Sequence, residues 1–155
     1  MRIWSALSLM LGALLLGTTF AHVLEIRAKR HMDGPLWTTL QQRLYQDFAT
    51  VGGAVEIGTI LSTAGLAWSV RNTTVAWLAL GAVACFASAF VIVWIGMVQP
   101  VNLQVARWTP AQIPGDWQRR QRRWDLGHAI RFGLHLTGFG LLVAMMIFEQ
   151  PWLQA

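Results

Sequence analysis

Four long apolar stretches, separated by polar segments, dominate the pattern of the chain. They cover residues 3–21, 48–70, 75–98 and 129–148. Each approaches the roughly 20 residues that an α-helix needs to cross about 30 Å of hydrocarbon. The pattern therefore predicts an all-α integral membrane protein, built as one four-helix transmembrane bundle. The predicted helices lie at about 3–24, 45–70, 74–99 and 125–148.

The composition supports lipid as the solvent of these helices. The 155 residues are 55% hydrophobic and only 12% charged, whereas soluble domains carry about 25% charged residues. A chain of this length is expected to form a single domain. The first apolar stretch is longer than the 7–15 residues typical of a signal-peptide core. We therefore expect it to be retained as the first helix.

Basic residues are distributed unevenly between the two kinds of connection. Nine fall in the two long connections: Arg27, Lys29, Arg30, Arg43, Arg107, Arg119, Arg120, Arg122 and Arg123. Only Arg2 and Arg71 fall on the other side. The positive-inside rule then places the long loops in the cytoplasm and both termini outside. The net charge of +5 is explained by this topology, so it does not indicate nucleic acid binding, and a multi-pass protein of the bacterial inner membrane is expected.

Tryptophans mark the predicted membrane boundaries, because amphipathic indoles favour that depth. The outer set is Trp4, Trp68, Trp77 and Trp152, and the cytoplasmic set is Trp37, Trp108, Trp117 and Trp124. The segment 101–123 carries prolines and an arginine-rich stretch. We expect this segment to lie as a loop along the cytoplasmic surface and to contact anionic lipid.

Polar residues recur on one face of each predicted helix, in its cytoplasmic half. The spacing of three or four residues that aligns side chains on a helix brings them together. The set comprises His22, Glu25, Tyr45, Glu56, Asn102, Asp125, His128 and Arg131. A charge at mid-membrane costs about 2.5–3.5 kcal/mol on insertion scales, so such residues are normally paired or functional. We expect them to surround one shared pocket.

A purely structural interpretation competes with this hypothesis. Glu56 and Arg131 would then form a buried pair that fixes helix packing, or Arg131 would extend to the cytoplasmic phosphates. Glu25 and Asp125 would be solvated at the interface. His135 is expected to be a neutral histidine that is hydrogen-bonded between helices, and not a ligand.

Two cofactor hypotheses follow from the same residues. His22 with Glu25, and Asp125 with His128, each place two ligands on one helical face. Glu56 could bridge them, as carboxylates do in di-iron bundles. If a metal is present, the candidate ligands are His22, Glu25, Glu56 and His128. Haem held by His22 and His128 is the second hypothesis.

A third hypothesis is acid–base chemistry without any cofactor. A buried histidine can take a proton from an acidic carbon, while Arg131 or Asn102 stabilises the resulting enolate. The single cysteine, Cys85, leaves no partner for an intramolecular disulfide or a thiolate metal cluster.

Four segments carry a resemblance to a known family. They are "AHVLEIRAKRHM", "WTTLQQRLYQDF", "PVNLQVARW" and "PGDWQRRQRRWDLGHAIR". Within them, Asn102, Trp117, Arg123-Trp124 and His128-x-x-Arg131 follow in order. Over nearly its whole length, the chain resembles the small four-span membrane proteins of the anthrone oxygenase family. Most members of that family are grouped as a domain of unknown function.

The resemblance implies a reaction class. Fungal members are similar to enzymes that oxidise an anthrone to an anthraquinone with O2, chemistry that in principle proceeds without a metal or a flavin. Carried onto this chain, the resemblance implies a site at Asn102, Trp124, His128 and Arg131. We expect His128 to act as the base, with Arg131 and Asn102 as partners of the oxyanion. His22, Glu25 and Glu56 would orient them.

The leading hypothesis is thus an oxidoreductase that acts on a lipophilic aromatic or quinol-like substrate. The first alternative is a non-enzymatic membrane protein that binds haem or a metal ion, or that serves as a partner subunit. The second alternative is a small transporter, which would need to form a homodimer because four helices offer only one polar pocket.

Overall fold

The structure is a computed structural model that describes residues 2–46, 48–109 and 111–148. The elements are, in chain order, α1 (Arg2–Arg30), α2 (Gly34–Leu44), η1 (Phe48–Gly52), α3 (Gly53–Ser69), α4 (Ala76–Ser88), η2 (Ala89–Val98), α5 (Gln99–Val105) and α6 (Trp117–Phe148). The two η elements are π-helices. The described ranges contain no β-strand, so the all-α prediction is confirmed.

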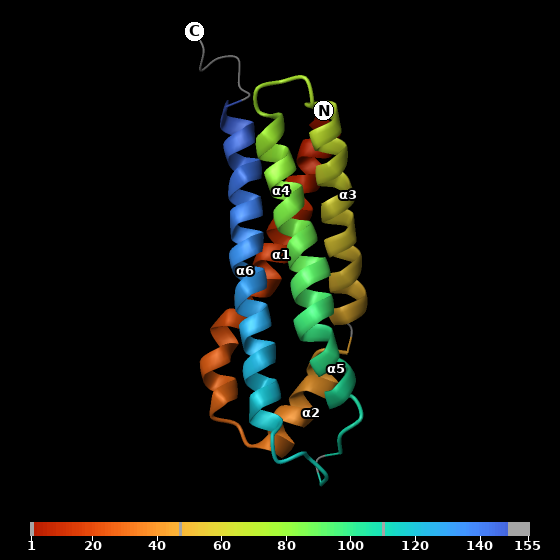
Figure 1. The fold of residues 1–155 in the computed structure, drawn as a ribbon, viewed down its shortest axis with the longest axis vertical. Coiled ribbons are helices and arrows are strands. Elements are labelled where there is room, and N and C mark those ends of the chain that lie inside the picture. The colour runs from red at the N-terminus through yellow and green to blue at the C-terminus, as the bar shows by residue number, and fades with distance from the viewer. Residues whose placement is uncertain (1, 47, 110, 149–155) are drawn as a thin grey trace.

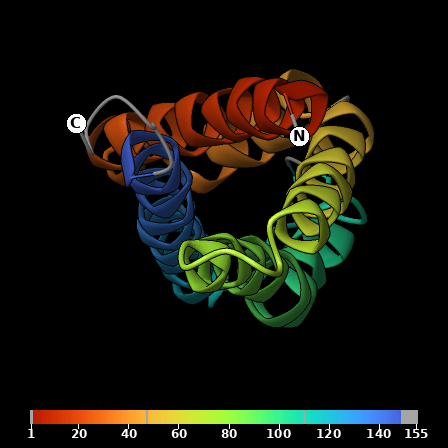
Figure 2. The same ribbon diagram turned by 90° about the horizontal axis from the view of Figure 1, so that it is seen from above.

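Within the described residues, four continuous helices are long and apolar enough to cross a membrane. They are α1, η1 with α3, α4 with η2 and α5, and α6. Figure 1 shows them side by side, with the short α2 lying across one end of the bundle. Seen from above, the four helices form a ring (Figure 2). Around this ring α1 packs against α3 and α6, and α4 packs against the same two helices. The chain is thus a multi-pass membrane protein.

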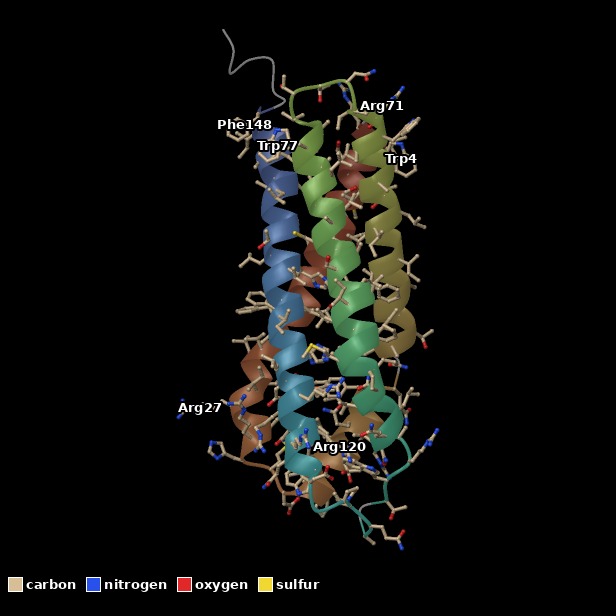
Figure 3. All side chains as sticks on the ribbon, viewed as in Figure 1. Trp4, Arg27, Arg71, Trp77, Arg120 and Phe148 are labelled. Atoms are coloured by element: carbon tan, nitrogen blue, oxygen red, sulfur yellow. The ribbon has the colours of Figure 1, made fainter. Side chains whose placement is uncertain are left out.

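The two ends of the bundle differ in their side chains. Trp4, Arg71, Trp77 and Phe148 lie at one end, and Arg27 and Arg120 lie at the end that carries α2 (Figure 3). The latter is called the α2 end, and it is the end that sequence predicts to be cytoplasmic. The C-terminus and Trp152, one of the predicted boundary tryptophans, lie outside the described residues.

The helices at the α2 end are longer than their apolar stretches predict. α1 continues to Arg30, and α6 already begins at Trp117. The segment 101–123, predicted to be a surface loop, contains the end of α5 and the first two turns of α6. Pro100 does not end the third helix. It lacks the N–H that would reach the Gly96 carbonyl one turn earlier, and Arg123 of α6 donates to that oxygen at 2.8 Å.

The helix α2 was not predicted, although its start follows familiar rules. The Asp33 side chain accepts a hydrogen bond from the Leu36 N–H at 2.9 Å, and Pro35 occupies the first turn. Both features favour helix initiation. Because α2 is short and lies in the connection between two spans, an analysis based on long apolar runs did not detect it.

Two apolar clusters divide the interior of the bundle along its length. The cluster far from α2 joins all four long helices and comprises Leu15, Leu66, Ala67, Val70, Val75, Leu78, Ala79, Ala82, Phe86, Leu142 and Met145. The cluster at the α2 end comprises Trp37, Val98, Val101, Val105 and Trp124. The buried ionisable side chains described below lie among the four long helices, in the same part of the bundle as the second cluster.

One close approach of helices positions the polar end of α6. A Cβ atom added to Gly127 would lie 2.7 Å from Cγ2 of Val98 in η2. Val98 is buried and its branched side chain has little rotamer freedom in a helix. Gly127 therefore allows α6 to lie directly against η2, next to His128.

We expect Gly127→Ala to destabilise the protein by about 1–3 kcal/mol, because the new methyl group overpacks this contact. The matched control is Gly133→Ala in the same helix, where an added Cβ meets nothing within 4 Å. That change should be neutral or stabilise by about 0.5–1 kcal/mol, since alanine favours helix. Thermal unfolding in detergent measures both. Equal shifts in the two variants would contradict the close approach.

The predicted orientation can be tested with cysteines in a Cys85→Ala background. Asn72→Cys lies in the α3–α4 connection and Gly115→Cys in the α5–α6 connection. In spheroplasts, a membrane-impermeant maleimide should label the first position at once and the second only after permeabilisation. Labelling in the reverse order would show that the α2 end faces outward.

Candidate functional site

A cavity of about 550 Å³ lies in the α2 half of the bundle. Residues from every long helix and from α2 line it. Seven of the nine predicted site residues are among them: His22, Tyr45, Glu56, Asn102, Trp124, His128 and Arg131. The other two, Glu25 and Asp125, are not part of the lining. The prediction of a shared pocket thus matches the position of these seven, while their catalytic roles stay predictions.

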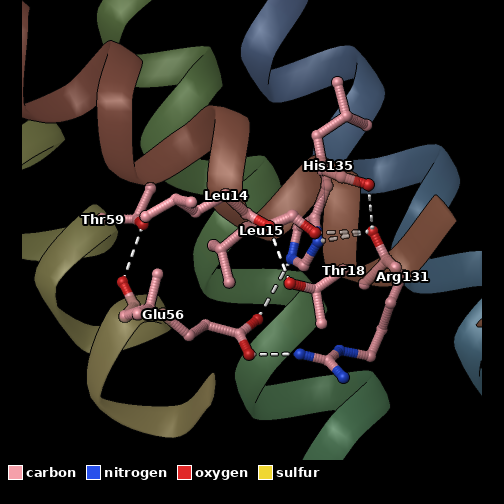
Figure 4. Close-up of polar contacts among 10 residues, drawn as sticks. Leu14, Leu15, Thr18, Glu56, Thr59, Arg131 and His135 are labelled. Carbon is pink, nitrogen blue, oxygen red and sulfur yellow. Dashed lines mark hydrogen bonds and ion pairs between the residues drawn. The ribbon is translucent and has the colours of Figure 1, made fainter. Parts of the chain in front are cut away.

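A buried ionic cluster forms one wall of the cavity. Glu56 of α3 is 2% exposed, and its Oε2 accepts a hydrogen bond from the Arg131 guanidinium. Its Oε1 lies 3.1 Å from Nε2 of His135. Figure 4 shows the carboxylate reaching from α3 to both side chains of α6. Arg131 and His135 are one turn apart on the same face of α6. Arg131 is therefore paired inside the bundle and does not extend to the interface.

The cluster also reaches the first helix. Nδ1 of His135 lies 3.3 Å from the hydroxyl oxygen of Thr19 in α1. With its proton on Nε2, His135 donates to Glu56, and its Nδ1 competes with the Leu15 carbonyl, 2.9 Å from the Thr19 hydroxyl oxygen, for the single hydrogen of that hydroxyl. The contacts fit the prediction for His135, a histidine hydrogen-bonded between helices. The cluster links α1, α3 and α6 at one level of the bundle.

Aromatic rings form a second wall. The ring centroids of His128 lie 4.1 Å from those of both His22 and Trp124, which are 5.2 Å from each other. Tyr45 and Phe48 pack against His22 at 5.1 and 5.5 Å. Nδ1 of His128 and Nδ1 of His22 make no hydrogen bond within the described part of the chain. Nδ1 of His22 lies 3.7 Å from Oε2 of Glu25, within ion-pair distance, whereas Nδ1 of His128 is buried without such a partner among the described residues.

Asn102 is oriented by the same tryptophan. The Trp124 indole N–H donates to the Asn102 side-chain oxygen at 2.9 Å. The Asn102 amide nitrogen donates one hydrogen to Gln99 at 3.4 Å. Because the oxygen is held by the indole, the end of Asn102 that remains for a ligand is a hydrogen-bond donor. This contact joins α5 to α6 and explains why both residues belong to one site.

Sequence reasoning missed the buried lysine of this region. Lys29 was counted among the cytoplasmic loop charges, but it is only 2% exposed. Its Nζ lies 2.6 Å from Glu25, donates to the Tyr45 hydroxyl, and sits 4.6 Å from the Trp124 ring centroid. The Glu25–Lys29 spacing of four residues is typical of helical ion pairs. This spacing was the feature of the sequence that could have indicated the Glu25–Lys29 ion pair.

Tyr45 connects this ion pair to the cavity wall. Its hydroxyl donates to Oε2 of Glu25 at 2.5 Å and accepts from Lys29. Burial raises the pKa of the Tyr45 phenol above its usual value, and the hydrogen bond to Glu25 raises it further. The phenol therefore stays protonated and acts as a donor. Glu25 is thus held by Tyr45, Lys29 and His22, yet its side chain remains 39% exposed. It is not part of the cavity lining.

Asp125 serves a different purpose from the one predicted. It is fully buried, and its Oδ2 accepts a hydrogen bond from Nε of Arg30 at 3.2 Å. One turn earlier in α6, the Gln121 amide donates to the Lys29 carbonyl at 2.9 Å. These contacts tie the end of α1 to α6. Asp125 is thus neither solvated nor in the pocket.

The arrangement does not favour the two cofactor hypotheses. Among the described residues, no group of three or more His, Cys, Asp and Glu side chains is placed to hold a metal ion. Of the candidate ligands, Glu56 is engaged by Arg131 and His135, and Glu25 by Lys29. A haem held by His22 and His128 would lie between their rings, which contact each other at 4.1 Å. The residues present thus do not fit the proposed metal or haem site.

Comparison with known proteins supports the resemblance drawn from sequence. The family model described as anthrone oxygenase matches residues 42–141. The match includes α3 to α6 up to Leu141, with all four predicted catalytic residues, and it leaves out His22 and Glu25. No curated protein and no solved structure matches the chain significantly. Because the matched region covers well over half of the chain, the protein belongs to the anthrone oxygenase family.

Proposed function

We propose that this protein is a membrane-embedded oxidoreductase that oxidises a lipophilic aromatic substrate, of anthrone or quinol type, with O2. The reaction takes place in the cavity at the α2 end, in a bacterial plasma membrane with that end toward the cytoplasm. One observation carries the proposal. The His128 side chain lines a cavity of about 550 Å³ together with the Asn102 amide and the Arg131 guanidinium.

The chemistry that this site would promote starts with proton abstraction. A base removes a proton from the methylene carbon of an anthrone, and the negative charge moves onto the carbonyl oxygen as an enolate. The enolate passes one electron to O2, and the resulting radical and superoxide combine to a peroxide. Loss of water from the protonated peroxide leaves a ketone. The sum is anthrone plus O2 giving anthraquinone plus H2O, so atoms and electrons balance.

The side chains divide naturally between these steps. His128 takes the proton from carbon and returns it to the peroxide, which is general acid–base catalysis. Arg131 and the amide nitrogen of Asn102 stabilise the enolate oxygen. Glu56 neutralises and positions Arg131. An anthrone-sized molecule fits the cavity, since ligand pockets of this kind measure about 300–1,000 Å³.

The neighbouring rings have supporting roles. Trp124 packs on His128 and holds the oxygen of Asn102, so it sets the distance between base and amide donor. His22 also packs against the base, with its ring centroid 4.1 Å from that of His128. Tyr45, Glu25 and Lys29 hold this group of rings in place. A flat aromatic substrate would find stacking partners on this wall.

His128→Ala should lower the rate of anthrone oxidation by about 10²–10⁴-fold, the usual contribution of a general base. Oxygen uptake by protein in vesicles, corrected for the uncatalysed reaction, measures this rate. The matched control is His31→Ala, because His31 is exposed in the α1–α2 connection. His31→Ala should leave the rate unchanged. Equal rates for the two variants would refute His128 as the base.

A further inference from the structure

The cavity is closed toward the aqueous phase by α2. Trp37 of α2 is fully buried against the second apolar cluster. The Gln42 side-chain amide donates to the carbonyls of Val105 and Trp108, at 2.8 Å each. These contacts fasten α2 to the end of α5, and Figure 1 shows α2 crossing beneath the bundle. A substrate from water would have to pass this layer.

Three sides of the cavity are closed by packed helices. α1 packs against both α3 and α6, and η2 packs against α6. The fourth side lies between the η1–α3 segment and the η2–α5 segment. Within the described residues, these two segments do not pack appreciably against each other, although α3 and α4 do so nearer the opposite end. The cavity therefore has one weakly closed side.

Two adjacent glycines lie on that side. Gly52 and Gly53 both line the cavity, and an added Cβ at either position meets nothing within 4 Å. Their missing side chains leave the start of α3 open. By contrast, glycines within packed interfaces, such as Gly138, would place a Cβ within 3.4 Å of neighbouring atoms. No neighbouring helix therefore packs closely against Gly52 or Gly53.

The borders of this side are apolar and exposed. Phe48 of η1 and Leu103 of α5 both line the cavity, yet they remain 44% and 55% exposed. Phe48 begins one candidate span, and Leu103 lies near the end of another. In a membrane, exposed apolar side chains at this position face lipid near the interface. The weakly closed side therefore opens onto the bilayer.

We propose that a lipophilic, flat polycyclic substrate enters the cavity sideways from the bilayer, across Gly52 and Gly53, between η1–α3 and η2–α5. The identity of the substrate rests on the proposed function, whereas the position of the entrance rests on the geometry alone. Such a molecule concentrates in the bilayer, so lateral entry avoids transfer through water. Entering over the glycines, it meets the aromatic wall, with Arg131 and Asn102 in reach of a polar edge.

The position of the entrance is tested without any turnover. Gly53→Cys, in a Cys85→Ala background, is treated with a bilayer-partitioning maleimide and with a charged, impermeant maleimide. Gly115→Cys in the aqueous α5–α6 connection is the reference. The ratio of the two labelling rates should favour the partitioning reagent at Gly53 by at least about tenfold over Gly115, as expected for a lipid-facing site. Equal ratios would overturn the proposal, because the cavity would then open to water.

The use of the entrance is tested by obstructing it. Gly53→Phe should lower kcat/KM for a tricyclic anthrone by about tenfold, because the phenyl ring obstructs the entrance. Gly140→Phe is the control, since Gly140 is equally free of neighbours but lies on α6 away from the cavity. Unchanged kcat/KM in Gly53→Phe, with the phenylalanine variants equally stable, would overturn lateral entry. If the unmodified protein oxidises no anthrone, the proposed function fails, and the labelling ratio alone decides the entrance.

Discussion

The fold depends on one buried carboxylate. Glu56 lies well inside its span, and an isolated charge there would be costly. Arg131 and His135 satisfy its two oxygens from α6, and His135 extends the contact to Thr19 of α1. The helices cannot shift relative to one another without leaving a buried charge unpaired. The same cluster faces the cavity, so the interaction that fixes the bundle also places a guanidinium in the site.

The remaining architecture isolates this cluster. Far from α2, the apolar cluster around Phe86 and Leu142 excludes water from the bundle. At the α2 end, Trp37 and Gln42 fasten α2 beneath the cavity. In between, the approach of α6 to η2 at Gly127 brings His128 onto the rings of Trp124 and His22. The reactive groups thus lie in a low-dielectric space, where hydrogen-bond donors act strongly on developing charge.

Sequence patterns predicted much of this arrangement because hydropathy and helical period are local properties. Apolar runs located the four spans, and the three-to-four spacing of polar residues placed Glu56, His128 and Arg131 on inward faces. The errors concern contacts that depend on tertiary neighbours. Lys29 follows the end of the apolar run and resembled a loop charge. Its burial requires α1 to continue and requires Tyr45 and Trp124 to cover it.

The same limitation applies to several side-chain pairings. Asp125 finds Arg30, and Trp124 finds Asn102. Both pairs join different helices across stretches of sequence with no periodic relation. α2 was missed because it is too short to form an apolar run of membrane-spanning length, and a helix this short depends on its packing under the bundle. The position of the site was therefore predictable from sequence, whereas the hydrogen-bond partners that orient its side chains were not.

The central claim is that the Glu56–Arg131 pair has both a structural and a chemical role. The most direct test is a double-mutant cycle with Glu56→Gln, Arg131→Met and both together, measuring thermal unfolding and anthrone oxidation in parallel. Each single change should destabilise the protein by about 3–5 kcal/mol, because it leaves a buried group unpaired. The double variant should recover most of the stability and yet remain without activity, because the guanidinium is gone. A double variant that is stable and oxidises anthrone at the original rate would contradict the account.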